Sequence, residues 1–258
     1  MNGLLRFDGV VAGYGRGDIL RRLELEVPRD AVTCLVGPNG AGKSTVLKTL
    51  SGLLKPRAGR IVFDGEDIAG LSPARVLARG IVHVPQERSL FPLMTVWDNL
   101  LMGGHSLRDR NVVRERAATI AERFPLVAQR RHARAGELSG GQQKLVEIAR
   151  ALMLEPKLIL LDEPTMGLEP KSRHLIFETI AGLREAGHTV LLVEQNARAG
   201  LAAADHGAVL DGGRVAIAGP GPQLLGDPRL GELYLGGAAA VANGSSTTSA
   251  GSGSRSAS

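Results

Sequence analysis

A short glycine-rich segment offers the clearest chemistry in the sequence. Residues 37–45 read Gly-Pro-Asn-Gly-Ala-Gly-Lys-Ser-Thr, between an apolar run and a stretch of helical character. Glycines let successive backbone N–H groups point at a phosphate, and a helix that follows adds the positive end of its dipole. Lys43 can then reach the β- and γ-phosphates of a nucleotide, while the Ser44 hydroxyl holds Mg²⁺. The segment predicts a phosphate-binding loop, but alone it does not separate a kinase, a GTPase and an ATPase.

Two adjacent carboxylates form a second candidate group. The apolar run 158–161 ends in Asp162 and Glu163, which Pro164 follows. A buried strand ending here would bring Asp162 beside the phosphate loop, where it can support Mg²⁺ directly or through water. Glu163 would point to the other side and could polarise an attacking water as general base. An apolar strand that ends in Asp-Glu is commonplace, so this prediction depends on the phosphate loop in the same chain.

A third segment, residues 138–143, reads Leu-Ser-Gly-Gly-Gln-Gln and precedes a helical stretch that runs to about residue 154. A serine and glycine amides at the start of a helix predict a second anion-binding site. The glycines adjoin a strong helix rather than a low-complexity tract, which argues against a flexible Ser-Gly linker. One chain therefore carries two phosphate cradles, although a single nucleotide has only one γ-phosphate.

Alternating strands and helices must position these groups. Apolar runs and turn signals predict strands at 31–36, 60–63, 81–84, 157–161 and 189–193, a hairpin of 208–210 with 215–218, and helices at 44–53, within 95–154 and at 172–186. Residues 23–27 alternate apolar and polar side chains, as half-exposed antiparallel strands do. The pattern predicts an α/β core with an antiparallel β layer and a helical insertion. Residues 237–258 are Ala-, Gly- and Ser-rich, and we expect them to be disordered.

Composition narrows the class of partner. Aromatic residues make up only 3% of the chain, too few for a surface that stacks bases, so we predict no nucleic-acid partner. The densest basic cluster, Arg130, Arg131 and Arg134, also lacks interleaved aromatic residues. The N-terminus is too short an apolar stretch for a signal peptide, and no window approaches the roughly 18 to 20 apolar residues of a membrane span. A single cysteine, Cys34, fits a reducing compartment. We expect a cytoplasmic protein whose contact with a membrane is peripheral.

The ordered motifs resemble the ATP-binding subunits of ABC transporters, from about residue 4 to residue 236. The resemblance implies an α/β fold: a P-loop NTPase core with an antiparallel β subdomain and a helical subdomain, at about 90–155, that carries the ABC signature. Residues 1–236 would form this cassette. In that family the signature of one copy closes on the nucleotide held by another, which implies a head-to-tail dimer with a second cassette, identical or paralogous.

The resemblance also assigns roles to individual residues. ATP would be held by Gly37, Pro38, Asn39, Gly40, Ala41, Gly42, Lys43, Ser44 and Thr45 of one copy and by Ser139, Gly140, Gly141 and Gln142 of the other. Tyr14 corresponds to the aromatic residue that stacks on adenine. Gln86 corresponds to the glutamine that senses Mg²⁺ and the attacking water, so that Ser44, Gln86 and Asp162 form the implied metal set. Glu163 would be the catalytic base.

One position departs from the wider family. The switch histidine expected after strand 189–193 is replaced by Gln195, within the sequence Val-Glu-Gln-Asn. Glutamine can hydrogen-bond a γ-phosphate oxygen but cannot carry positive charge, so we expect weaker stabilisation of the transition state. The Glu-Gln-Asn form resembles the ATPases of branched-chain amino-acid importers.

The predicted function is therefore the ATPase of a membrane transporter at the cytoplasmic face of the membrane. Its partners would be transmembrane permease subunits and, indirectly, a solute-binding receptor. Uptake of branched-chain or related amino acids is the first hypothesis. Transport of another solute, including export, is the second, and a non-transport ABC ATPase acting in DNA repair or on ribosomes is the third. The third class usually has a coiled-coil insertion or two fused cassettes, and this sequence has neither.

Overall fold

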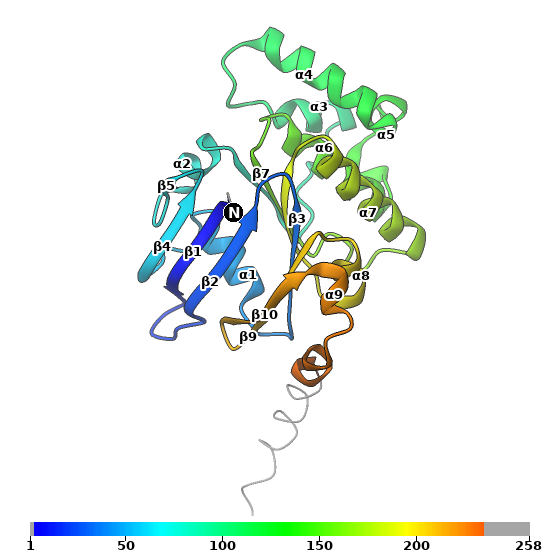
Figure 1. The fold of residues 1–258 in the computed structure, drawn as a ribbon. Helices are drawn as coiled ribbons and strands as arrows, with labels where there is room; N and C mark the ends of the chain where they lie inside the picture. The colour runs from blue at the N-terminus through cyan, green and yellow to red at the C-terminus, as the bar shows by residue number, and fades with distance from the viewer. Residues whose placement is uncertain (1–2, 235–258) are drawn as a thin grey trace, which may run out of the picture.

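The computed structural model describes residues 3–234, which form two β-sheets and surrounding helices (Figure 1). One sheet has four strands in the order β2-β1-β4-β5, and the other has six in the order β10-β9-β3-β8-β7-β6. The tail predicted to be disordered, 237–258, lies outside the described residues. None of the helices within 3–234 combines the length and the apolar character needed to cross a lipid bilayer.

The smaller sheet is antiparallel, as the alternating pattern predicts. It consists of β1 (Gly3–Ala12), β2 (Leu20–Pro28), β4 (Ala58–Phe63) and β5 (Glu66–Asp67). In β2 the side chains of Leu23, Leu25 and Val27 are buried while the intervening residues are exposed. One face of this sheet therefore covers the core and the other faces solvent.

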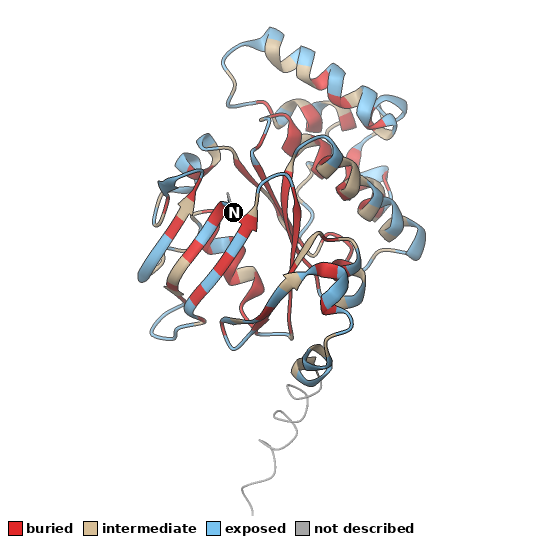
Figure 2. Ribbon diagram, viewed as in Figure 1, coloured by how far each residue is buried: buried red, intermediate tan, exposed pale blue. Residues whose placement is uncertain are grey.

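The larger sheet is mainly parallel and lies at the centre of the molecule. Its strands are β3 (Val32–Val36), β6 (Ile81–Val84), β7 (Leu158–Asp162), β8 (Thr189–Val193), β9 (His206–Asp211) and β10 (Arg214–Pro220), of which only β10 runs antiparallel to its neighbour. Every residue of β3, β7 and β8 is buried, which explains their uninterrupted apolar sequences (Figure 2). Because these strands are parallel, their carboxyl ends meet at one edge of the sheet.

The helices lie on both faces of the larger sheet and at one end of the molecule. Their bounds are α1 Lys43–Leu50, α2 Pro73–Ala78, α3 Val96–Met102, α4 Arg110–Arg123, α5 Pro125–Gln129, the 3₁₀ turn Ala135–Glu137, α6 Gly140–Leu152, α7 Pro170–Glu185, α8 Ala197–Ala202 and α9 Gly221–Leu224. Helices α3 to α6 gather above the sheet, in green in Figure 1. The sequence predicted α1, α6 and α7 to within a few residues, but it did not predict the short helices α2, α8 and α9.

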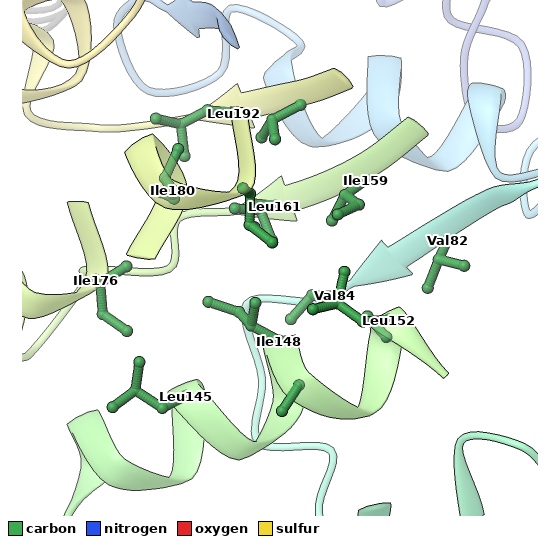
Figure 3. Packing of buried hydrophobic residues seen from close by; sticks show 14 of the residues in the cluster. Val82, Val84, Leu145, Ile148, Leu152, Ile159, Leu161, Ile176, Ile180 and Leu192 are labelled. Carbon is green, nitrogen blue, oxygen red and sulfur yellow. The ribbon is translucent and has the colours of Figure 1, made fainter. Parts of the chain in front are cut away.

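Two apolar clusters hold the layers together. The first packs α6 and α7 against one face of the larger sheet, where Ile148 and Ile176 lie toward Leu161 of β7 (Figure 3). The second fills the space between the two sheets and includes Val46 and Leu47 of α1. Strand β7, which ends at the candidate carboxylates, contributes to both clusters and is therefore supported from both faces.

Candidate nucleotide site

The phosphate loop joins β3 to α1, as its sequence predicts. Gly37 and Gly42 have φ angles of 155° and 108°, in a region that residues with a side chain rarely occupy. A Cβ atom at Gly37 would also lie 2.2 Å from the carbonyl oxygen of Leu210, whereas one at Gly40 would meet no atom within 4 Å. Gly40 has a φ angle of 81°, so all three glycines are needed for the backbone conformation, and Gly40 also borders open space.

Lys43 lies over this loop. Its Nζ donates hydrogen bonds to the carbonyl oxygens of Gly37 at 2.8 Å and Pro38 at 3.2 Å. Burial lowers the pKa of Lys43, and the nearby carboxylates of Glu163 and Asp162 oppose that shift. The ammonium group is therefore held at the loop by acceptors that an incoming phosphate can replace.

Asp162 ends strand β7 beside the phosphate loop. Among residues 3–234 its Oδ1 atom is buried without a hydrogen-bond partner. Burial and the neighbouring Glu163 raise the pKa of this carboxyl, while Lys48, Lys43 and Lys144 act in the opposite direction. A buried carboxylate oxygen without a partner costs free energy unless a cation binds it. Together with the Ser44 hydroxyl in the same cavity, of about 750 Å³, it fits the hard oxygen ligands of Mg²⁺.

Glu163 follows with a backbone conformation that is unusual for its type. Its φ angle is 44°, and its N–H donates to the carbonyl oxygen of Val193 at 2.9 Å. A left-handed conformation outside glycine costs roughly 1 to 2 kcal/mol, so neighbouring contacts must hold it. The Glu163 side chain is half-buried and therefore remains accessible to water.

Glu194 is a contributor that the sequence analysis missed. It is 2% exposed and its Oε1 atom accepts hydrogen bonds from Thr165, from the N–H at 3.3 Å and from the hydroxyl at 2.8 Å. Burial raises the pKa of Glu194, and the bonds from Thr165 counteract this. These bonds fix the turn after Glu163 to the end of β8. The only signal in the sequence was a carboxylate directly after an apolar strand.

The two predicted glutamines lie at different edges of the site. Gln195 donates from Nε2 to Oδ1 of Asn39 at 3.4 Å, so it reaches the phosphate loop from the end of β8. Gln86 lines the same cavity as Ser44 and Asp162, and its Nε2 lies 3.0 Å from the sulfur of Met166. The structure thus gathers both glutamines, Asp162 and the phosphate loop at the carboxyl edge of the parallel strands.

Tyr14 lies in the loop between β1 and β2 and is 48% exposed. Lys48 of α1 has its Nζ 5.9 Å from the centre of the tyrosine ring. The ring therefore lies close to the helix that begins at the phosphate loop. An exposed aromatic face at this place can accept a flat base, and its assignment to adenine stays a prediction.

The signature segment lies at the start of α6. The Ser139 hydroxyl accepts from the N–H of Gln142 at 3.3 Å, and the Gln142 side chain accepts from the N–H of Ser139 at 3.1 Å, forming a reciprocal cap. A Cβ atom at Gly141 would lie 2.6 Å from the Ser172 side chain, so glycine is needed there. Within the described chain no hydrogen bond or ion pair connects residues 138–142 to residues 37–45. Within residues 3–234 the two cradles thus make no direct polar contact with each other.

The sequence is similar to known proteins over most of its length. The family profile described as ABC transporter matches residues 20–166. A high-affinity branched-chain amino acid transport ATP-binding protein of Pseudomonas aeruginosa, BraG, is 42% identical over 234 residues, covering 91% of this chain and 100% of its own length. The lipopolysaccharide export system ATP-binding protein LptB of Haemophilus influenzae is 35% identical, with 90% of this chain and 97% of its own length covered.

Solved structures share the architecture. An ATP-binding cassette of an ABC transporter in its ADP conformation superposes with a TM-score of 0.84 at 34% identity, covering 92% of this chain and all of the other. A dimeric post-hydrolysis cassette bound to ADP and phosphate gives a TM-score of 0.73 at 28% identity, covering 84% and 98%. The predicted P-loop NTPase fold is confirmed. The chain belongs to the ABC transporter family, as an ATP-binding subunit of the kind that hydrolyses ATP to power transport.

Proposed function

We propose that this ATPase powers the uptake of branched-chain or related amino acids. The observation that carries the proposal is the 42% identity to the Pseudomonas aeruginosa protein over that protein's entire length. Gln195, which replaces the switch histidine of the wider family, also supports this proposal. The sequence Glu-Gln-Asn around it resembles the ATPases of branched-chain amino-acid importers.

We infer that ATP binds against residues 37–45 with its base on Tyr14. The loop N–H groups and Lys43 would then bind the phosphates, with Lys43 exchanging its carbonyl partners for phosphate oxygens. Mg²⁺ would be held by Ser44, Asp162 and Gln86, which line one cavity. When bound, the metal neutralises charge on the β- and γ-phosphates.

The side chains around this site supply the chemistry of hydrolysis. Glu163 accepts a proton from a water molecule whose oxygen attacks the γ-phosphorus, while the bond to the bridging β–γ oxygen breaks and ADP leaves. Gln86 and Gln195 position the water and a γ-phosphate oxygen through their amide groups. Catalysis of this kind depends mainly on positioning and charge neutralisation.

We infer that a second cassette completes each site. The exposure of Ser139 at the start of α6 leaves the signature segment open to a second copy, and the similar cassette bound to ADP and phosphate is dimeric. ATP would close a head-to-tail pair and hydrolysis would let it open. The pair would sit peripherally at the cytoplasmic face of the membrane on permease subunits, and a solute receptor would deliver the substrate to them.

Export is the second candidate function. The similarity to the lipopolysaccharide export protein, at 35% identity over nearly its full length, is the observation that favours it. The substrate contacts of either system would lie on the permease chains. The permease chains would therefore determine the direction of transport.

Uptake in cells tests the proposal. The native chain is replaced by the Glu163→Gln variant, and entry of radiolabelled leucine, isoleucine and valine is measured against wild type. We expect uptake to fall to background, while Glu185→Gln, an exposed carboxylate at the end of α7, leaves it unchanged. Uptake equal to wild type in the Glu163→Gln strain, with loss of lipopolysaccharide from the cell surface, would favour export instead.

A further inference from the structure

The segment that carries Gln86 is held by helix α6. It follows β6 at residues 85–89, and α6 packs beside β6 and β7 through Leu145, Ile148 and Leu152 (Figure 3). On the adjoining side of α6, charged residues recur three positions apart, at 144, 147 and 150. A buried helix side with three charges is unusual, because each must find a partner to offset the loss of water.

Lys144 holds the first part of the segment. It is 7% exposed, and its Nζ donates to the carbonyl oxygens of Pro85 at 3.0 Å and Gln86 at 3.5 Å. The same Nζ lies 2.6 Å from Oε2 of Glu147. The backbone at Gln86 is therefore tied to a side chain one turn into the signature helix.

Glu147 and Arg150 hold the last part of the segment at Ser89. Oε1 of Glu147, which is 2% exposed, accepts from the Ser89 N–H at 2.5 Å and from its hydroxyl at 3.0 Å. Arg150 donates to the Ser89 carbonyl oxygen at 2.9 Å and to its hydroxyl at 2.6 Å. Every polar group of Ser89 thus contacts α6.

Such a cluster fixes geometry more than it adds stability. A buried ionic network is often no more stable than apolar residues of the same volume, but removal of one member leaves the others without compensation. Contacts at both ends restrict the position of the residues between them. Gln86, whose own side chain is exposed, depends on these contacts for its placement.

We propose that Lys144, Glu147 and Arg150 are positioning residues that clamp the 85–89 segment to α6, so that Gln86 moves with the helix whose first turn is the signature. The inference rests on the role of Gln86 in hydrolysis proposed above. It links the two cradles of one chain, because a shift of the signature helix is transmitted to the glutamine beside that chain's own phosphate loop.

Steady-state hydrolysis by the full chain tests the clamp. In Glu147→Ala we expect kcat to fall roughly tenfold or more, with KM for ATP within about twofold of wild type, because a small misplacement lowers the rate while the phosphate loop is untouched. The matched control is Arg116→Ala, which removes the contacts of α4 with the Met153 carbonyl oxygen and Glu155 near the far end of α6. Its kcat should stay within about twofold of wild type.

A double-mutant cycle with Gln86→Ala makes the test specific. If the clamp acts through Gln86, Glu147→Ala should lower kcat by less than about twofold in the Gln86→Ala background. The clamp would be overturned if the decreases in kcat from Glu147→Ala and Gln86→Ala multiplied in the double variant, or if Glu147→Ala changed only KM. Neither outcome would affect the role of Gln86. A Gln86→Ala chain with wild-type kcat would instead overturn the role of Gln86, and the clamp with it. Should Glu147→Ala fail to fold, Ser89→Ala, which removes only the hydroxyl, replaces it in the cycle with an expected loss of about threefold.

Discussion

The phosphate loop and the signature segment are both glycine-containing helix starts, yet the structure surrounds them differently. The phosphate loop lies behind buried strand β3, and Lys43 is only 6% exposed. Burial lowers the pKa of Lys43 and raises that of Asp162 next to it. At the other start, Ser139 is exposed and its polar groups pair with Gln142. One cradle is a charged site in which Lys43 and Asp162 are buried, and the other is a capped helix end that faces outward.

The two cradles should therefore contribute differently to nucleotide binding and to hydrolysis. Charges that are desolvated before the nucleotide arrives interact strongly with its phosphates, because little reorganisation is then needed. An exposed helix start offers N–H groups, but these groups remain hydrated. Their interaction with a phosphate becomes strong only when another surface covers the helix start and excludes water. The first cradle should therefore determine binding by a single chain, and the second should affect only hydrolysis in a pair.

Replacement of Lys43 removes the buried positive charge of the phosphate loop. In Lys43→Ala we expect hydrolysis to fall by about 10² to 10³, since a charged donor to the phosphates is lost, and binding of ATP to weaken as well. Titration calorimetry and phosphate release measure the two effects. Lys55→Ala, an exposed lysine after α1, is the control and should behave as wild type. Unchanged binding in Lys43→Ala would remove the distinction between the cradles.

Replacement of Ser139 tests the outward-facing cradle. Ser139→Ala should lower hydrolysis by roughly 10- to 150-fold, because a hydrogen bond to a charged group is typically worth about 1.5 to 3 kcal/mol, while the affinity of the single chain for ATP stays the same. Loss of the helix cap should also lower the free energy of unfolding by about 1 kcal/mol. Urea unfolding and calorimetry separate these effects. Weaker ATP binding by this variant at concentrations where the chain is monomeric would contradict the proposed division.

The desolvated pocket should also respond to pH through His83 of β6, which lines the cavity with Asp162. Burial, helped by the charge of Lys48, lowers the pKa of His83 from 6.5 to about 4. The unfolded chain then binds more protons between these values, so stability from the neutral ring is present above about pH 6.5 and lost as pH falls toward 4. Between pH 7 and pH 5, we expect the free energy of unfolding of His83→Leu to fall by about 1 to 2 kcal/mol less than that of the wild type. Urea titrations at several pH values measure this free energy. If it changed equally with pH in both proteins, His83 would not contribute to the pH dependence of stability.

The sequence predicted the two cradles better than the contacts that support them. Strands β3, β7 and β8 were placed to within a residue because strands buried on both faces have uninterrupted apolar sequences. Helices α2 and α8 have only six residues each, too few to show a helical period. The contact of Glu194 with Thr165 spans 29 positions, and no local pattern encodes such a pairing. Residue types thus predicted the chemistry, while tertiary packing determined its support.

Replacement of Gln195 should lower the rate of hydrolysis less than replacement of Lys43 or Ser139, and it tests whether charge is needed beside the phosphate loop. Its amide reaches Asn39 of the phosphate loop and supplies one neutral donor where other family members would have a cation. Gln195→Leu should lower kcat roughly fivefold, since the neutral hydrogen bond that the Gln195 amide donates to Asn39 is worth about 1 kcal/mol. Gln195→His should restore the rate and exceed wild type more at pH 6 than at pH 8, because a protonated imidazole places charge near the γ-phosphate. The ratio of kcat at the two pH values, relative to wild type, measures this difference. An equal ratio in the two proteins would mean that charge at this position does not reach the transition state, and that Gln195 acts only by holding Asn39.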